Sequence, residues 1–261
     1  MKIGVVLESM GLPLRQGLPQ AAKLGVGGVQ FDAIGDFSPE RLADTARREL
    51  KNLLKTFDQQ ITALNCPLRH ALDEALNQQP RIEYVRNVMT LAFEFGARIV
   101  IVPFPKLPGE NEPERARLLR EALTDLGRHG DRVGSVLALE IGFDPPEAVR
   151  DYLATFDVGS LKVNYDPANM LANGFDPVKG IVPLHRLIAH THARDARKVS
   201  VSRGVQEVTL GAGDVDWLAY VATMASVEYR GWLTIERERT DDAIKEMERA
   251  VGFLRRMVVP G

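Results

Sequence analysis

Short apolar runs rich in valine and isoleucine alternate with helical patterns from one end of the chain to the other. This alternation is typical of a parallel sheet whose strands are joined by helices. The runs predict strands at 2–8, 28–33, 60–66, 98–104, 135–141, 160–166, 187–193 and 232–237. Eight strand–helix units in 261 residues average about 33 residues each, the size expected of a closed (β/α)8 barrel. We therefore expect an α/β fold in which residues 1–261 form one TIM barrel domain.

An open, doubly wound sheet is the main competing architecture. The sequence has no Gly-x-Gly-x-x-Gly motif after the first predicted strand, where such a fold would carry its dinucleotide-binding turn. An open sheet also places its site at one crevice, whereas four predicted strands here end in ligand-type residues. Both observations favour the barrel.

Local signals indicate where several helices begin. Three predicted starts pair an N-cap or capping-box residue with a helix-favouring partner: Ser38 with Pro39, Asn111 with Pro113, and Asp144 with Glu147. The turn Gly211-Ala212-Gly213 precedes a helix for which we expect Asp214 or Asp216 as N-cap. The last helix has apolar residues near a 3.6-residue repeat, at Ile244, Met247, Val251, Leu254 and Val258. Residues 196–212 form a long connection after the seventh strand, and such loops often serve as lids or substrate clamps.

Four predicted strands end in a residue that binds metals in proteins: Glu140, Asp166, His192 and Glu236. Their separations of 26, 26 and 44 residues match whole strand–helix units rather than a local metal-binding loop. Because the carboxyl ends of barrel strands meet on one face, these side chains are expected to converge on one ion. Three carboxylates and one imidazole favour manganese, magnesium or cobalt, with zinc also compatible.

Alternation along the strands predicts which other residues face the barrel interior. The residues two positions before three of the ligands share their faces, namely Asn164, His190 and Thr234. We interpret His190 as a buried histidine beside the site rather than as a fifth ligand.

Further polar residues lie near the predicted strand ends. His70, after the third strand, is either a contact for a substrate hydroxyl or an exposed loop residue. Arg194, Arg197 and Lys198 either clamp a substrate phosphate or are solvated, so phosphorylation of the substrate stays open.

The remaining histidines and the cysteine carry no functional signal. His129 and His185 lie in helical patterns and are expected at the surface. Cys66, the one cysteine, cannot form an internal disulfide and is expected to be a small buried apolar group.

Charge and hydropathy restrict the partners. A net charge of -2 and a pI near 6.2 argue against nucleic acid or an anionic membrane as partner, since proteins that bind them usually carry a basic surplus. The first residues lack the apolar core and cleavage site of a signal peptide, and no apolar run approaches the roughly 20 residues that span a bilayer. We expect a cytoplasmic protein with no membrane partner, and a homo-oligomer is compatible with the sequence.

Several motifs resemble those of the sugar phosphate isomerase and epimerase superfamily, the xylose isomerase-like barrels that also include endonuclease IV-type repair enzymes. The marks are Leu139-Glu140, Asn164-Tyr165-Asp166-Pro167-Ala168-Asn169, His192-Ala193-Arg194-Asp195, Leu210-Gly211-Ala212-Gly213-Asp214-Val215-Asp216 and Ile235-Glu236. The resemblance covers almost the whole chain. It implies that Glu140, Asp166, His192 and Glu236 bind one divalent metal and that the two glutamates act as acid and base in the epimerase branch.

Two departures from the family pattern limit the alternatives. Many relatives have a histidine where this chain has Asn169, so a contact to substrate or to a second metal is changed. The three-zinc repair enzymes need several further histidines and carboxylates, and this chain has five histidines in all. A trinuclear nuclease is therefore disfavoured.

The sequence thus predicts a metal-dependent isomerase or epimerase that acts on a ketose or keto-polyol. Glu140 and Glu236 are the candidate catalytic residues, and the candidate substrate contacts are His70, Asn164, Asn169, His190, Arg194, Arg197 and Lys198. A dehydratase of keto-inositols is the nearest alternative. An endonuclease IV-like enzyme and a non-catalytic sugar-binding barrel are the alternatives from other classes.

Overall fold

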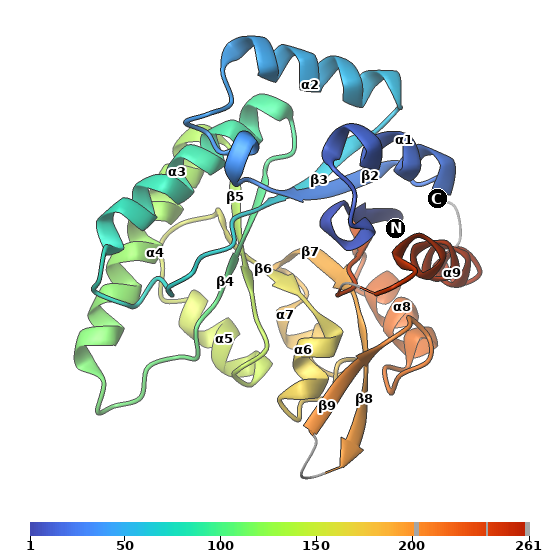
Figure 1. Cartoon of the computed structure of the whole chain (residues 1–261). Coiled ribbons are helices and arrows are strands. Elements are labelled where there is room, and N and C mark those ends of the chain that lie inside the picture. Colours follow the sequence, from blue (N-terminus) through green and yellow to red (C-terminus); the bar gives the residue numbers. More distant parts are fainter. Residues whose placement is uncertain (201–203, 239, 259–261) are drawn as a thin grey trace.

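The computed structural model describes residues 1–200, 204–238 and 240–258 (Figure 1). Eight parallel strands close a barrel in the order β1-β10-β7-β6-β5-β4-β3-β2. They are β1 (Lys2–Val6), β2 (Gly28–Asp32), β3 (Gln60–Asn65), β4 (Ile99–Pro103), β5 (Val136–Glu140), β6 (Leu161–Tyr165), β7 (Ile188–Ala193) and β10 (Trp232–Ile235). β1 pairs with both β10 and β2, which closes the ring. The predicted barrel is confirmed, and each strand falls within its predicted range.

Helices connect the strands and form the outer layer of the barrel (Figure 1). They are α1 (Leu14–Leu24), α2 (Asp44–Thr56), α3 (Gln78–Phe95), α4 (Pro113–Val133), α5 (Pro146–Leu153), α6 (Pro167–Ala172), α7 (Ile181–Leu184), α8 (Trp217–Ser226) and α9 (Ala243–Arg255). Short 3-10 helices, Glu8–Met10 and Gly35–Phe37, follow β1 and β2. The carboxyl ends of all barrel strands consequently open on one face.

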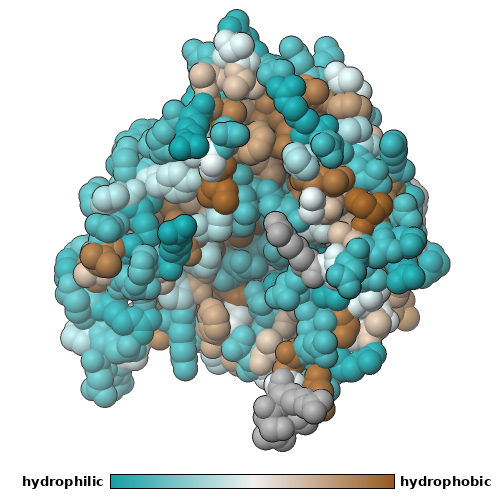
Figure 2. Space-filling view, in the orientation of Figure 1, coloured by the Kyte–Doolittle hydropathy of each residue, from teal (hydrophilic) through white to brown (hydrophobic). Residues whose placement is uncertain are grey.

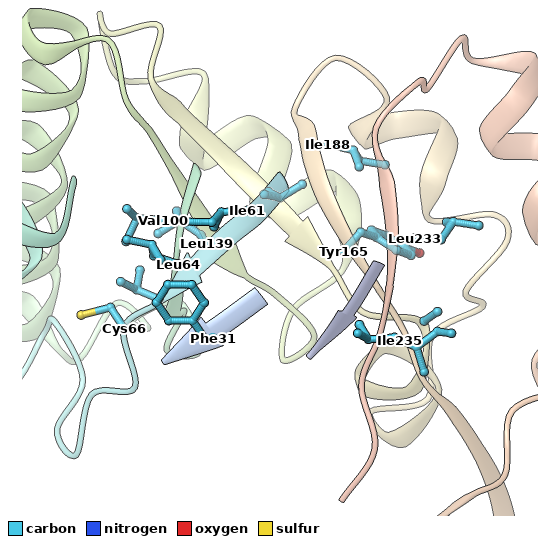
Figure 3. Close-up of a cluster of buried hydrophobic side chains, with 14 of the residues drawn as sticks. Phe31, Ile61, Leu64, Cys66, Val100, Leu139, Tyr165, Ile188, Leu233 and Ile235 are labelled. Atoms are coloured by element: carbon cyan, nitrogen blue, oxygen red, sulfur yellow. The ribbon is translucent and has the colours of Figure 1, made fainter. Parts of the chain in front are cut away.

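The main hydrophobic core lies between the strands and the helices. Phe31, Leu64, Val100 and Leu139 belong to it, and Figure 3 draws them among the buried side chains of this core. A separate small cluster of Ala63, Ile101 and Ala138 is formed by strand residues that alternate with these. The alternation along each strand thus separates a large outer core from an interior with small apolar side chains, which leaves room for polar ones.

Part of the interior is too narrow for any side chain. A Cβ atom at Gly28 would lie 2.5 Å from a Thr62 methyl group and 2.6 Å from the Trp232 ring. Glycine at this position in β2 therefore allows the Trp232 indole to pack against the backbone.

One predicted helix start is wrong, and at another only the predicted cap is wrong. Ser38 and Pro39 precede α2 by several residues, and the Ser38 carbonyl accepts hydrogen bonds from the amides of Arg41 and Leu42 in a turn. Asp144 does not cap α5, because its carboxylate accepts a hydrogen bond from the Leu107 amide at 2.8 Å. α5 nevertheless begins close to the predicted start, at Pro146, with Glu147 in its first turn.

The other helix signals are confirmed. Pro113 occupies the first turn of α4, although Glu112 rather than Asn111 precedes it directly. Asp216 caps α8 by accepting from the Ala219 amide at 3.0 Å. The apolar stripe of α9 buries Met247, Val251 and Leu254.

His129 is also placed wrongly by the sequence. It lies on α4 but is 8% exposed, and its ring nitrogens contact the Thr90 hydroxyl at 3.1 Å and the Arg132 guanidinium at 2.9 Å. The histidine fills the contact between α3 and α4. His185, by contrast, is exposed as predicted.

The surface is mostly hydrophilic on the face seen in Figure 2, with apolar residues in small groups. Large exposed apolar side chains such as Phe143 and Leu218 come from separate elements. Within the described ranges, no helix is long and apolar enough to cross a membrane.

The long connection after β7 is a β-hairpin rather than an irregular loop. Its strands β8 (Asp195–Ser200) and β9 (Gly204–Val208) pair antiparallel and project from the barrel beside α6 (Figure 1). Asp195 anchors the hairpin, because its buried carboxylate accepts hydrogen bonds from the Gly211 and Gly213 amides at 2.9 and 3.0 Å and from the Trp217 indole at 3.0 Å. These glycine amides therefore stabilise the fold.

Replacing this anchor tests its importance. Asp195→Ala should lower the free energy of unfolding by roughly 3 kcal/mol, because several buried donors lose a charged acceptor. Asp214→Ala is the matched control, since Asp214 accepts one exposed hydrogen bond, from the Lys198 amide, in the same hairpin. Urea unfolding followed by circular dichroism measures both, and equal losses would contradict the assigned role of Asp195.

Candidate metal centre

The four predicted ligands converge at the carboxyl end of the barrel. Glu140 ends β5, Asp166 follows β6, His192 lies on β7 and Glu236 follows β10. One ligand atom from each lies within 4.8 Å of the others. His192 Nδ1 is 2.9 Å from Glu236 Oε2, 3.2 Å from Glu140 Oε1 and 3.8 Å from Asp166 Oδ2. This is the size of a site for a single ion.

Exposure divides the four residues into two pairs. The side chains of Asp166 and His192 are 0% and 2% exposed, whereas those of Glu140 and Glu236 are 21% and 28% exposed. The two glutamates therefore reach the mouth of the barrel, where a substrate would enter, while the aspartate and histidine form the floor.

Asp166 combines two tasks. Its Oδ1 caps α6 by accepting hydrogen bonds from the Ala168 and Asn169 amides at 2.8 and 3.1 Å. Pro167 follows at the first helical position, where the missing amide hydrogen costs nothing. The cap fixes the carboxylate and turns Oδ2 toward His192.

Gln30 orients His192 from across the barrel. Gln30 lies on β2 between Val29 and Phe31 and is 1% exposed. Its Oε1 accepts a hydrogen bond from His192 Nε2 at 3.1 Å, so that Nδ1 faces the carboxylates. Gln30 is not among the residues predicted from the sequence, although alternation along β2 gives it an inward position between two outward apolar residues.

His190 and Asn164 lie beneath the centre and do not reach the mouth of the barrel. His190 Nδ1 donates to Asn164 Oδ1 at 2.9 Å, and Nε2 lies 2.8 Å from the Thr234 hydroxyl. Burial and the nearby charge of His192 lower the pKa of His190 well below its usual value. Asn164 Nδ2 in turn lies 3.2 Å from His192 Nδ1. Both predicted substrate contacts are fully buried, so they support His192 instead.

The charges of the centre are strongly coupled. Burial alone would lower the pKa of His192, but the charge of Glu236 and hydrogen bonds to the carboxylates raise it well above its usual value. Burial would raise the pKa of Asp166 and Glu236, yet Arg194 and His192 lower the pKa of Asp166, and His192 and Arg194 lower that of Glu236. The carboxylates of Asp166 and Glu236 are thus held in their charged form.

The donor set fits a divalent cation. It offers one imidazole nitrogen and three carboxylates. Glu236 Oε2 is buried and has no hydrogen-bond partner, although Nδ1 of His192 is only 2.9 Å away. A buried carboxylate oxygen without a partner is costly, and a shared cation would satisfy it. Manganese, magnesium and cobalt suit this mostly oxygen site, and zinc is compatible.

For Arg194, Arg197 and Lys198 the sequence left two alternatives open, a phosphate clamp and solvated side chains. Arg194 lies in the centre, where its NH1 donates to Asp166 Oδ2 at 2.9 Å. Arg197 and Lys198 are exposed on β8, and the Arg197 guanidinium donates to the Ala212 carbonyl. The three residues therefore do not converge on one phosphate.

The other two predicted contacts lie at the periphery. His70, in the connection after β3, is half-exposed and pairs with Glu74 at 2.7 Å. Asn169 is half-buried on α6, where its amide contributes to the cap on Asp166. Neither side chain belongs to the group of four.

The strand ends on the other half of the barrel also carry polar groups, which are not among the residues predicted from the sequence. Glu8 Oε1 accepts from the Asp32 amide at 3.0 Å, and Asp32 Oδ1 accepts from Asn65 Nδ2 at 2.7 Å. Desolvation, together with the charge of Asp32, raises the pKa of Glu8 to about 7. Glu236 adds to this effect, so Glu8 shares the electrostatic environment of the centre. The rule used for the last four strands, that ligand-type residues follow strand ends, would have found Glu8 and Asp32.

The xylose isomerase-like TIM barrel family matches residues 18–257, and the chain belongs to this family. No curated protein sequence matches the chain. Many solved structures share its fold.

Three solved structures illustrate the likeness. A xylose isomerase domain protein from Planctomyces limnophilus is 24% identical, with a TM-score of 0.86 over 98% of this chain and 96% of that chain. The 3-keto-D-glucoside 4-epimerase YcjR from E. coli is 17% identical, with a TM-score of 0.79 over 98% and 99%. A xylose isomerase-like TIM barrel protein from Mycobacterium smegmatis in complex with magnesium is 15% identical, with a TM-score of 0.79 over 98% and 96%.

The raised pKa of Glu8 predicts a pH-dependent stability. Folding raises the pKa of Glu8 from near 4.5 to about 7, so the folded protein binds the Glu8 proton more tightly than the unfolded chain does. The stability that this proton contributes is fully present below about pH 4.5 and is lost as the pH rises through about 7. Glu8→Gln keeps an acceptor for the Asp32 amide but removes the charge. The gain in Tm over the unchanged protein should therefore be larger at pH 8 than at pH 5.

Thermal unfolding at both pH values measures this difference. Asp36→Asn, at an exposed position of the 3-10 helix after β2, is the control and should shift Tm little at either pH. A gain for Glu8→Gln that is the same at pH 5 and pH 8 would show that the Glu8 carboxyl does not titrate in this range.

Proposed function

We propose that this protein is a divalent-metal-dependent sugar isomerase or epimerase that acts on a ketose or keto-polyol. The observation that carries the proposal is the group of four ligand atoms within 4.8 Å of one another at the carboxyl ends of barrel strands. Relatives of the same fold include an epimerase of a keto-glucoside and a protein in complex with magnesium. Manganese, magnesium or cobalt is the proposed ion.

The metal, held by Glu140, Asp166, His192 and Glu236, would polarise the substrate carbonyl and so acidify the neighbouring C–H bond. The two glutamates come from β5 and β10, which β6 and β7 separate in the ring. Their partly exposed carboxylates can therefore approach a bound sugar from different sides. One glutamate removes the proton next to the carbonyl, and the other returns a proton to the opposite face for epimerisation or to the adjacent carbon for isomerisation.

Arg194 adds an electrostatic contribution at the same place. Its Nε lies 3.7 Å from Glu236 Oε2, and neither atom has a hydrogen-bond partner. The guanidinium therefore places a positive charge beside the carboxylates, where it would stabilise negative charge that develops on the substrate oxygen.

The charge of the chain supports a small carbohydrate rather than a nucleic acid. The net charge is -2, and two arginines at the mouth, Arg194 and Arg237, both lie beside the carboxylate of Glu207. Positive charge that is neutralised in this way contributes little to phosphate binding.

A substrate panel tests the reaction. Free and phosphorylated ketoses, keto-inositols and hydroxypyruvate would be incubated with the manganese-loaded protein in deuterated water and followed by NMR. Deuterium uptake next to the carbonyl is expected, and the product distinguishes epimerisation, isomerisation and loss of water by a dehydratase. Binding of sugars without any exchange would indicate a non-catalytic barrel, and salt-sensitive binding to abasic duplex DNA would indicate a nuclease.

The choice of histidine is tested by metal affinity. His192→Ala should weaken manganese binding to the chelator-stripped protein by about tenfold or more, because a ligand is lost. His190→Ala removes a supporting contact and should have the smaller effect. Calorimetric titration of both variants measures the difference in affinity. Equal losses of affinity would mean that His190 is the ligand in place of His192 or that both histidines bind the metal.

The roles of the two glutamates separate from metal binding in glutamine variants. Glu140→Gln and Glu236→Gln each keep a carbonyl oxygen as ligand but lose the base, so epimerisation should fall by roughly 10²-fold or more. Each variant should still exchange the proton of the epimer that faces its remaining carboxylate. Proton NMR in deuterated water measures both effects.

The exposed Glu147 on α5 supplies the control, since Glu147→Gln should retain full activity. Full epimerase activity in either metal-loaded centre variant would show that this glutamate is a ligand only.

A further inference from the structure

Glu207 on β9 is a buried carboxylate outside the group of four. Its side chain is 9% exposed and points from the hairpin toward the barrel. Glu207 Oε2 lies 3.6 Å from Arg194 NH2, and Oε1 lies 3.3 Å from Arg237 NH1. Oε1 also accepts a hydrogen bond from the Glu238 amide at 3.1 Å. One carboxylate thus connects the hairpin to the segment that follows Glu236.

Arg194 lies between this carboxylate and the centre. Its NH1 donates a hydrogen bond to Asp166 Oδ2 at 2.9 Å, whereas its Nε lies 3.7 Å from Glu236 Oε2, too far for a hydrogen bond. Both Nε and Oε2 are buried and lack a hydrogen-bond partner, although a small shift of the guanidinium would join them. Glu207 Oε2, 3.6 Å from NH2, attracts the same guanidinium and so competes with Glu236 for it.

The position of Arg194 matters to a metal because both compete for the same oxygens. Asp166 and Glu236 are two of the four proposed ligands, and a guanidinium that pairs fully with them would occupy the lone pairs that the ion needs. An unpaired guanidinium beside the site would also repel a divalent cation. Glu207 reduces both effects, since it supplies a third carboxylate to the same arginine.

We propose that Glu207 is a positioning residue of the metal centre, which holds the guanidinium of Arg194 away from Glu236 so that this carboxylate can bind the ion. This inference rests on the metal site of the proposed function. Glu207 lies on β9, outside the barrel. Its proposed role therefore connects the hairpin of β8 and β9 to the metal centre.

Manganese affinity tests the proposal without reference to catalysis. Glu207→Gln should weaken manganese binding to the chelator-stripped full chain by about tenfold, as the loss of an outer contact at a metal site typically does. Titration calorimetry and the electron paramagnetic resonance signal of free manganese measure this, with circular dichroism to verify the fold. If the unchanged protein does not bind manganese, the proposed metal centre fails. If it binds and Glu207→Gln binds equally well, only the role of Glu207 fails.

Glu246→Gln is the matched control for a purely structural effect. Glu246 accepts from the Thr209 hydroxyl at 2.6 Å and lies 3.9 Å from Arg237, so it braces the same region, and Arg194 is not among its contacts. Its replacement should leave manganese affinity within about twofold. Equal weakening by Glu207→Gln and Glu246→Gln would overturn the proposal, because both would then act through the stability of the hairpin.

Variants of Arg194 complete the test. In an Arg194→Gln background, Glu207→Gln should no longer change manganese affinity, and Arg194→Gln alone should bind manganese at least as tightly as the unchanged protein. The manganese affinity of Arg194→Gln alone tests the proposal even if Glu207→Gln does not fold. Weaker binding by Arg194→Gln alone would show that the arginine assists the ion rather than competing with it, and would overturn the proposal.

Discussion

The concentration of negative charge around His192 is the constraint on which the rest of the centre depends. Three carboxylates lie within 4 Å of one imidazole nitrogen at the carboxyl end of the barrel, and two residues of this group are almost completely buried. Such an arrangement is unfavourable unless positive charge is supplied. In the protein alone, the raised pKa of His192 and the guanidinium of Arg194 supply it. A divalent ion would take over this task, and the surrounding hydrogen bonds keep the ligands in place for it.

Most of the fold and the four central residues could be predicted from the sequence because both depend on regular patterns. Strand and helix periodicity determine the barrel, and the barrel brings the ends of parallel strands together irrespective of their distance along the chain. The spacing of Glu140, Asp166 and His192 therefore sufficed to predict that they meet. His129 was expected at the surface but is buried. Helical periodicity does not reveal which polar side chain is covered by a neighbouring helix.

The supporting residues were harder to predict because their partners are set by three-dimensional contacts. Nothing in the sequence near Gln30 indicates that it hydrogen-bonds a histidine 162 positions later. Glu207 had no signal at all, since a long connection between a strand and a helix does not indicate an ordered hairpin with a buried acid. The predicted cap at Asp144 is absent for the same reason, because the Leu107 amide takes its carboxylate.

The hydrogen bond between Gln30 and His192 has a consequence for folding. It joins the second strand of the chain to the seventh, and Glu236 comes from the last strand of the barrel. No contiguous half of the polypeptide contains all the groups that shape this centre. Contacts between such distant segments form late when chain closure is slow. The complete coordination environment therefore arises only once the ring of strands has closed, so metal uptake would report the final step of folding rather than the appearance of secondary structure.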